Sequence, residues 1–220
     1  MEFLKKRPAI DFYTEQEGEI GFVDVVQSLA SYNFNLNKLK KHGKSIINVS
    51  YIYGDQLITG RTERIKDINV IPSPYLTGAL DEFFNLPLIP MIETTRGCPF
   101  TCTFCTEGQH YWSKVKTKSK EVITGEISYI SKKMNNLETK KKRTDFYIAD
   151  SNFGMYKEDL NTCKALAEEQ KKTGYPKYIS VTTGKNKQDR ILEAAKIVNG
   201  AMKITGSVQS LDSEILENVS

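Results

Sequence analysis

The stretch MIETTRGCPFTCTFC, residues 91–105, decides how the rest of the chain is interpreted. It holds three of the four cysteines, Cys98, Cys102 and Cys105, which are separated by three and then by two residues. The apolar run from Leu86 to Ile92 leads into it and is typical of a buried strand. Functional sites in α/β folds gather in loops at the carboxyl ends of such strands. We therefore expect the three thiols to lie in a functional loop.

Strand and helix patterns alternate from this stretch onward. Helices are predicted over residues 120–134, 158–172, 191–198 and 211–219, from apolar residues at helical spacing. Strands are predicted over residues 86–93, 144–149, 178–182 and 201–206. Four successive βα units predict an α/β fold with a parallel sheet and right-handed crossovers. Because the last strand would leave an open sheet edge, we expect a longer barrel or half-barrel, of which this chain is a fragment.

Residues 1–85 show a different pattern. Ala9 to Tyr13 is strand-like, and a helix follows whose inward face is predicted to consist of Phe22, Val25, Val26 and Leu29. A strand that leads into one helix, with no further parallel strand beside it, cannot bury both of its faces, so we expect neighbouring structure before Met1 or in a partner. Ser45 to Gly60 predicts a β-hairpin that turns at Gly54-Asp55. Residues 71–84 (IPSPYLTGALDEFF) predict an apolar connector laid over a domain surface, which places the domain boundary at residue 85, with domains over 1–85 and 86–220.

The composition is that of an ordinary globular protein, with 39% hydrophobic and 26% charged residues. No apolar run approaches the roughly 20 residues that span a bilayer, and the amino terminus lacks the pattern of a signal peptide. These features predict a cytoplasmic protein with no membrane span. The Lys-rich run from Lys132 to Arg143 is typical of a solvated helix end and loop. No aromatic residues interleave with it, so no nucleic-acid partner is predicted.

Three thiolates on one short loop can hold three irons of a 4Fe-4S cluster and leave the fourth iron open to another ligand. A zinc site is the alternative, with His110 or Cys163 as the fourth ligand, although only Cys102 and Cys105 form the C-x2-C pair that structural zinc favours. Inert thiols are a third interpretation. Cys163 falls on the inner face of a predicted helix, where a small core residue is expected. His42 and His110 are expected at the surface or in loops.

Residues 98–105, CPFTCTFC, resemble the C-x3-C-x2-C signature of the radical S-adenosylmethionine (radical SAM) superfamily. An aromatic residue, Phe104, stands directly before the last cysteine, as is usual there. The wider segment TTRGCPFTCTFC, together with IPSPYLTGALDEFF upstream and GSVQSLDSEIL downstream, is similar to the cobalamin-binding branch. This resemblance covers most of the chain.

The resemblance implies the first four βα units of a partial (βα)6-type barrel, preceded by the tail of a Rossmann-like cobalamin-binding domain and a β-hairpin connector. Cobalamin is implied as a cofactor beside a 4Fe-4S cluster and S-adenosyl-L-methionine, although the D-x-H-x-x-G element of some cobalamin proteins is absent. The cluster would be held by Cys98, Cys102 and Cys105. Its open iron would chelate S-adenosylmethionine and cleave it to a 5′-deoxyadenosyl radical that abstracts hydrogen from substrate.

The resemblance also implies residues that contact the cosubstrate. Phe104 would contact the adenine, and Asn152, in the loop Asp150 to Phe153 where Gly-Gly-Glu is usual, would hold the amino group. Gln209 and Ser210 match a polar contact position. Turn formation and helix capping are the alternative for both loops.

The resemblance further implies an electron donor such as flavodoxin or ferredoxin, and a small-molecule, tetrapyrrole or lipid-like substrate. Methyl transfer to an unactivated carbon, ring rearrangement and oxidative cyclisation are its possible outcomes. A function from another class stays open beside it: a zinc-stabilised α/β binding module that uses its Lys-rich segment on nucleic acid.

Overall fold

A computed structural model describes residues 2–204 and 210–218 of the chain, which divides into two compact units, Met1–Lys66 and Asp67–Ser220. The expected domain boundary at residue 85 therefore lies inside the second unit. The reason is that the connector joins that unit's core, where Tyr75 and Phe84 are buried. The segment is packed and not a flexible linker, since Tyr75 and Phe84 enter the core while Leu76 and Phe83 stay partly exposed. None of the helices in the described ranges is long and apolar enough to cross a bilayer.

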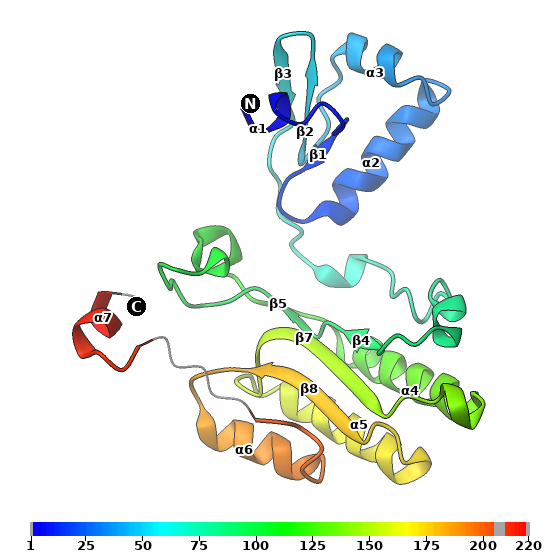
Figure 1. Cartoon of the computed structure of the whole chain (residues 1–220), viewed down its shortest axis with the longest axis vertical. Helices are drawn as coiled ribbons and strands as arrows, with labels where there is room; N and C mark the ends of the chain where they lie inside the picture. Colours follow the sequence, from blue (N-terminus) through cyan, green and yellow to red (C-terminus); the bar gives the residue numbers. More distant parts are fainter. Residues whose placement is uncertain (1, 205–209, 219–220) are drawn as a thin grey trace. The chain divides into compact units, whose positions relative to one another are not determined.

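The first unit is built on a three-stranded antiparallel sheet of order β1-β2-β3. Its elements are α1 (Glu2–Lys5), β1 (Tyr13–Thr14), α2 (Gly18–Ser31), α3 (Leu36–His42), β2 (Val49–Tyr53) and β3 (Gln56–Thr59) (Figure 1). The predicted hairpin is confirmed, since Tyr53 pairs with Gln56 across the turn. The first strand does have a neighbour within the chain, but it is antiparallel, since Tyr13 pairs with Ser50 of β2. All three strands are antiparallel, so the Rossmann-like origin of this unit stays a prediction.

Helix α2 covers the small sheet with only part of its predicted face. Val25 is buried, and Leu29 packs against the same cluster as Ile46 and Val49. Phe22 is 64% exposed and Val26 39% exposed, so the prediction that they face inward is wrong. A three-stranded sheet with a two-residue edge strand is too narrow to cover an apolar stripe of that width.

The second unit contains the predicted α/β fold, with a parallel sheet of order β4-β7-β8 and a small antiparallel sheet of β5 and β6. Its strands are β4 (Met91–Ile92), β5 (Thr95–Arg96), β6 (Lys116–Thr117), β7 (Asp145–Phe153) and β8 (Tyr178–Thr183). Its α-helices are α4 (Lys120–Asn136), α5 (Asp159–Thr173), α6 (Gln188–Ile197) and α7 (Ser213–Asn218). Short 3-10 helices complete it: η1 (Ile68–Val70), η2 (Asp81–Asn85), η3 (Thr106–Gly108), η4 (His110–Trp112) and η5 (Thr139–Lys141). Of the predicted fourth strand, Met202 forms a parallel bridge with Ile179, and residues 205–209 lie outside the described ranges.

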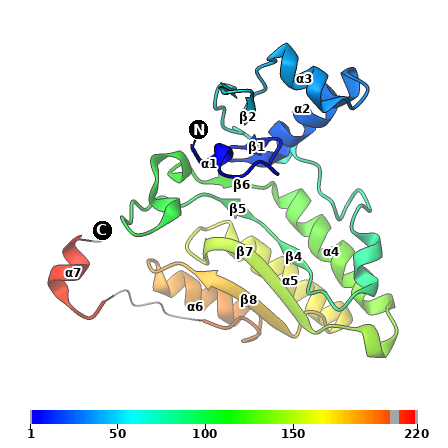
Figure 2. The same ribbon diagram turned by 45° about the horizontal axis from the view of Figure 1, so that its top comes forward.

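Helices α4, α5 and α6 lie on one face of the parallel sheet (Figures 1 and 2). The predicted inward stripes are confirmed, because Ile130 on α4, Cys163 and Leu166 on α5 and Ile191 on α6 are all buried in one cluster. The opposite face carries partly exposed side chains, Met91, Tyr147 and Tyr178. Parallel sheets normally bury both faces, so this open face distinguishes the unit from a complete α/β domain.

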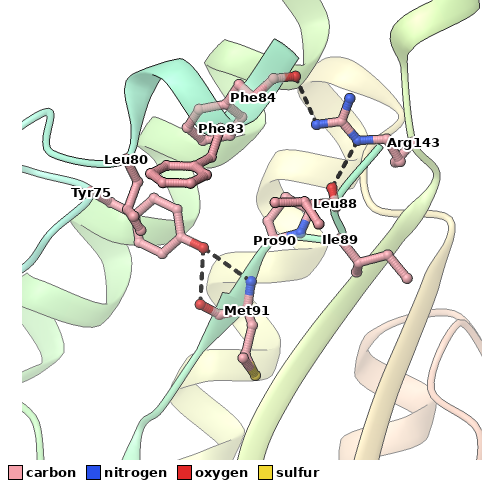
Figure 3. Close-up of a pocket in the computed structure, with 9 residues that line it drawn as sticks. All are labelled: Tyr75, Leu80, Phe83, Phe84, Leu88, Ile89, Pro90, Met91 and Arg143. Atoms are coloured by element: carbon pink, nitrogen blue, oxygen red, sulfur yellow. Dashed lines mark hydrogen bonds between the residues drawn. The ribbon is translucent and has the colours of Figure 1, made fainter. Parts of the chain in front are cut away.

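The predicted buried strand over Leu86 to Ile92 is largely wrong. Only Met91 and Ile92 pair with β7, because Pro87 and Pro90 have no N–H to donate to a ladder. Leu88 and Ile89 are about half exposed and line a pocket of about 240 Å³ together with Tyr75 and Phe84 (Figure 3). The apolar character of this run therefore reflects the wall of a pocket more than the core of a sheet.

Candidate metal centre

The cysteine loop begins where β5 ends and is closed at its base by β6, through the pairs Thr95–Thr117 and Arg96–Lys116. The backbone N–H of Cys98 donates to the carbonyl of Trp112 at 2.9 Å. Within the loop, the N–H of Cys105 donates to the carbonyl of Cys102 at 3.1 Å. These contacts fold residues 97–112 back on themselves, and all three cysteines lie in the irregular backbone between β5 and η3.

Two glycines are required by this folding. Gly97 has φ +107°, and a Cβ there would lie 2.6 Å from the carbonyl oxygen of Trp112. At Gly108, a Cβ would lie 2.2 Å from the carbonyl oxygen of Cys102. Both distances are far below van der Waals contact, so any side chain at either position would displace the backbone that carries the thiols.

The root of the loop is fixed to β7 by a buried carboxylate. Thr94 donates its N–H to one oxygen of Asp150 at 2.7 Å, and its hydroxyl donates to the other. The hydroxyl of Thr95 donates to that second oxygen at 3.1 Å. Asp150 is 2% exposed, and this burial raises the pKa of its carboxyl group although the threonine donors oppose the shift. Sequence reasoning missed this clasp between Thr94, Thr95 and Asp150.

Asn152 lies in β7, although the sequence had predicted a loop over Asp150 to Phe153. The strand is longer than expected because Phe153 pairs with Thr183 of β8 after a register shift. The Nδ2 of Asn152 lies 3.2 Å from the Sγ of Cys98, and the side chain is 8% exposed. The structure therefore brings together two residues predicted for the site, Asn152 and Cys98.

Tyr156 contributes a further polar group that sequence reasoning missed. Its hydroxyl is buried and has no hydrogen-bond partner among the described residues. Burial, followed by the charges of Cys98, Asp159 and Asp150, raises the pKa of Tyr156 to about 12. An unpaired buried hydroxyl is costly, and near a thiol loop it indicates a position where a bound group completes the hydrogen bonding.

The other predicted contact residues that the structure describes, Phe104 and Ser210, contact different groups. Phe104 is 54% exposed, and Nζ of Lys185, from the loop after β8, lies 5.8 Å from its ring centroid. Ser210 accepts a hydrogen bond from the N–H of Asp212 at 3.0 Å, as in a turn before a helix. Gln209 lies outside the described residues.

The thiols themselves are free and carry no disulfide. Cys98 and Cys102 are half-buried and Cys105 is exposed, whereas Cys163 is a core residue whose burial raises its pKa to about 12. This placement confirms the interpretation of Cys163 as a core residue and leaves it outside the ligand set. His110 is exposed in η4. In the described part of the chain, no three His, Cys, Asp or Glu side chains are gathered closely enough to hold a metal ion.

The residue types around the loop fit an iron–sulfur cluster. Three free thiols supply soft ligands, a buried amide donates to one of their sulfurs, and an unpaired tyrosine hydroxyl lies near the same thiol. The tight approaches at Gly97 and Gly108 fix the backbone that carries the thiols, while the thiols are not gathered around one point. Cys98, Cys102 and Cys105 have the chemistry to hold such a group, which would require their sulfurs to come closer together.

The apolar pocket beside β4 is not part of this site. Pro90 precedes β4 and Arg143 precedes β7, so the pocket lies at the amino-terminal edge of the parallel sheet. The cysteine loop follows β4 and β5 at the opposite, carboxyl edge, where sites in α/β folds gather. Position thus separates the candidate metal centre from the pocket.

Comparison with known proteins gives relatives over nearly the whole chain. It is 30% identical, over 230 residues, to 2-(S-pantetheinyl)-carbapenam-3-carboxylate methyltransferase of Streptantibioticus cattleyicolor, covering 99% of this chain and 31% of the relative. It is 29% identical to the cobalamin-dependent radical SAM methyltransferase TokK of Streptomyces tokunonensis, with 99% and 31% covered. The chain is a relative of the cobalamin-dependent radical SAM methyltransferases.

A solved structure has a similar fold to this chain. The cobalamin-dependent S-adenosylmethionine radical enzyme OxsB superposes with a TM-score of 0.63 at 19% sequence identity, covering 99% of this chain and 30% of that one. No protein-family model matches the chain. Almost all of this chain aligns with these two curated relatives. It spans only about 31% of their length.

Proposed function

We propose that this chain carries the cluster-binding part of a radical SAM enzyme, with Cys98, Cys102 and Cys105 as ligands of a 4Fe-4S cluster. The observation that carries the proposal is the thiol loop at the carboxyl edge of the parallel sheet, with Asn152 donating to Cys98 from the neighbouring strand. When bound, such a cluster supplies the electron that cleaves S-adenosylmethionine reductively. The chain's own residues hold the loop in place and exclude water from one side of Cys98.

The cosubstrate contacts belong to this proposal as well. Phe104 is exposed at the loop and presents its ring and backbone to an adenine. Asn152 directs its amide nitrogen at Cys98, so its amide oxygen is the acceptor that an ammonium group requires. Gln209 and Ser210 are proposed as the polar contacts that follow the fourth strand.

Methyl transfer is the proposed reaction. The two relatives that cover 99% of the chain are both named methyltransferases, whereas an anaerobic magnesium-protoporphyrin IX monomethyl ester cyclase of Cereibacter sphaeroides covers 57%. Cobalamin is proposed as the second cofactor because one of these two relatives, TokK, is named a cobalamin-dependent enzyme. A flavodoxin or ferredoxin is proposed as electron donor, in the cytoplasm, because the cluster needs a one-electron reductant.

Anaerobic reconstitution with ferrous iron and sulfide tests the cluster assignment. The unchanged chain is expected to turn brown and to take up about four irons and four sulfides. Cys102→Ala is expected to lose most of that uptake because it removes a ligand. Cys163→Ala, at a buried core thiol, is expected to keep the uptake of the unchanged chain. The iron and sulfide contents of each protein are measured by colorimetric assay.

Two results would contradict the assignment. Stoichiometric zinc that excludes iron would favour the zinc-stabilised binding module. Equal loss of iron in Cys102→Ala and Cys163→Ala would show that the loop thiols have no special role, because only one of these residues lies in the loop.

A further inference from the structure

The contact between Asn152 and Cys98 joins residues 54 positions apart in the sequence. Cys98 lies in the loop after β5, and Asn152 lies near the end of β7, which pairs with β4 (Figure 1). The amide Nδ2 approaches the sulfur to 3.2 Å. A contact between two separate elements at this distance is set by the fold and not by local chain geometry.

The surroundings hold the amide of Asn152 in place. Its side chain is 8% exposed, and Asp150, two residues earlier on the same strand, is bonded to Thr94 and Thr95 just before the cysteine loop. The strand and the loop are therefore joined at two successive points. An amide in such a buried position cannot exchange its partner for water at low cost.

The orientation of the amide follows from the chemistry of the sulfur. A thiolate that ligates a metal has no proton and can only accept a hydrogen bond. The nitrogen of Asn152 must therefore face Cys98, and the oxygen must face away from it. The N–H group then lies against a sulfur that would carry part of the charge of a bound cluster.

A hydrogen bond to a cluster sulfur acts on the reduction potential. Reduction adds an electron, and part of the added negative charge spreads onto the sulfur ligands. A donor N–H stabilises that more negative state, so the potential rises. The effect is larger for a buried donor, because the local dielectric constant is low.

We propose that Asn152 is a positioning residue that acts through Cys98 and raises the reduction potential of the cluster. This inference rests on the proposed function, since it needs a cluster on Cys98. It goes beyond a cosubstrate contact, because it assigns the amide nitrogen of Asn152 to the metal centre. The nearby hydroxyl of Tyr156, which has no partner among the described residues, is a separate group and is left unchanged in the test.

The test compares midpoint potentials of reconstituted protein by redox titration followed by electron paramagnetic resonance. Asn152→Leu keeps the approximate volume of the side chain and removes the N–H donor to Cys98. The reduction potential of the cluster in this variant is expected to fall below that in the unchanged chain at equal iron content. Asn152→Asp also adds a negative charge, and a larger fall is expected. Asn161→Leu, the same substitution at an exposed position of α5, is the matched control and should leave the potential unchanged.

The outcomes separate this inference from the proposed function. Failure of the unchanged chain to take up iron and sulfide would overturn both. A full cluster in Asn152→Leu with an unchanged potential would overturn the role of Asn152 alone. If Asn152→Leu takes up less iron, the test uses Asn152→Asp instead. A cluster potential in Asn152→Asp at or above that of the unchanged chain would overturn the proposal. Iron content and circular dichroism accompany each titration, because a purely structural role would change them without shifting the potential.

Discussion

Asp159 carries a buried carboxyl group at the start of α5, where one of its oxygens accepts hydrogen bonds from the N–H groups of Gly154 and Tyr156 at 2.7 and 2.9 Å. Burial raises the pKa of Asp159 to about 7, and the charge of Asp150 adds to that shift. In the unfolded chain the pKa returns to about 4. At pH values between about 4 and about 7, folding therefore takes up a proton on Asp159. The folded state is most favoured when the carboxyl group of Asp159 is neutral.

The sign of the pH effect follows directly. The stability that the neutral carboxyl contributes is fully present below about pH 4 and is lost as the pH rises through about 7. Asp159→Asn keeps an acceptor oxygen and cannot ionise, so this loss should disappear. The variant is expected to gain stability relative to the unchanged chain between pH 4 and pH 8, by up to about 4 kcal/mol. Urea unfolding at several pH values measures the difference, and a gap that is constant with pH would contradict the assignment.

The residue types and their spacing in the sequence predicted the thiol loop but not the contacts that hold it. The spacing of Cys98, Cys102 and Cys105 is a local pattern, so the sequence alone indicated a loop of metal-binding thiols. The clasp between Thr94 and Asp150 joins residues 56 positions apart, and no local pattern marks such a pair. Asn152 is predicted from the resemblance to the radical SAM superfamily, but its contact with Cys98 depends on how β7 packs against the loop.

At the scale of elements, Arg143 holds the apolar segment before β4 in place. Its Nε donates to the carbonyl of Leu88 and one Nη donates to the carbonyl of Phe84, both at 2.9 Å (Figure 3). These carbonyls belong to a stretch whose prolines prevent regular strand pairing. The guanidinium group of Arg143 thus supplies hydrogen bonds to two carbonyl groups in a segment that forms no regular strand pairing there.

Arg143→Lys is expected to destabilise the second unit by about 1–2 kcal/mol, because a single ammonium cannot reproduce the fork of the guanidinium and leaves carbonyls unpaired. Lys142→Arg is the control, since Lys142 is exposed and its side chain makes no hydrogen bond to this segment in the described part of the chain. Chemical unfolding measures both. Equal stability of Arg143→Lys and the unchanged chain would show that the fork is dispensable.

The elements differ in how well the sequence predicted them, for physical reasons. Helices α4 and α5 bury one stripe against the sheet, and that periodic signal is local. The run before β4 is equally apolar, but its prolines turn it into a pocket wall, which hydrophobicity alone does not reveal. On α2, only Val25 and Leu29 of the four predicted inward residues face the sheet, because the width of the sheet that covers the helix cannot be known from the helix itself.

At the scale of the whole molecule, the parallel sheet places the thiol loop at its carboxyl edge and leaves one face open. Met91, Tyr147 and Tyr178 line that face. The relatives extend over about three times the length of this chain, and the α/β class followed from the repeated strand–helix pattern. In the first unit, the hairpin of β2 and β3 followed from the sequence, whereas the pairing of β1 with β2 did not, because β1 is a two-residue strand that has almost no local signal.

The proposed function requires that the loop hold a cluster with one iron open to S-adenosylmethionine. The most direct measurement is the electron paramagnetic resonance spectrum of the reconstituted and reduced chain, recorded with and without S-adenosylmethionine. If the cosubstrate binds the open iron, the g values of the reduced cluster are expected to shift on its addition. A fully assembled cluster whose spectrum stays the same at saturating S-adenosylmethionine would contradict the claim.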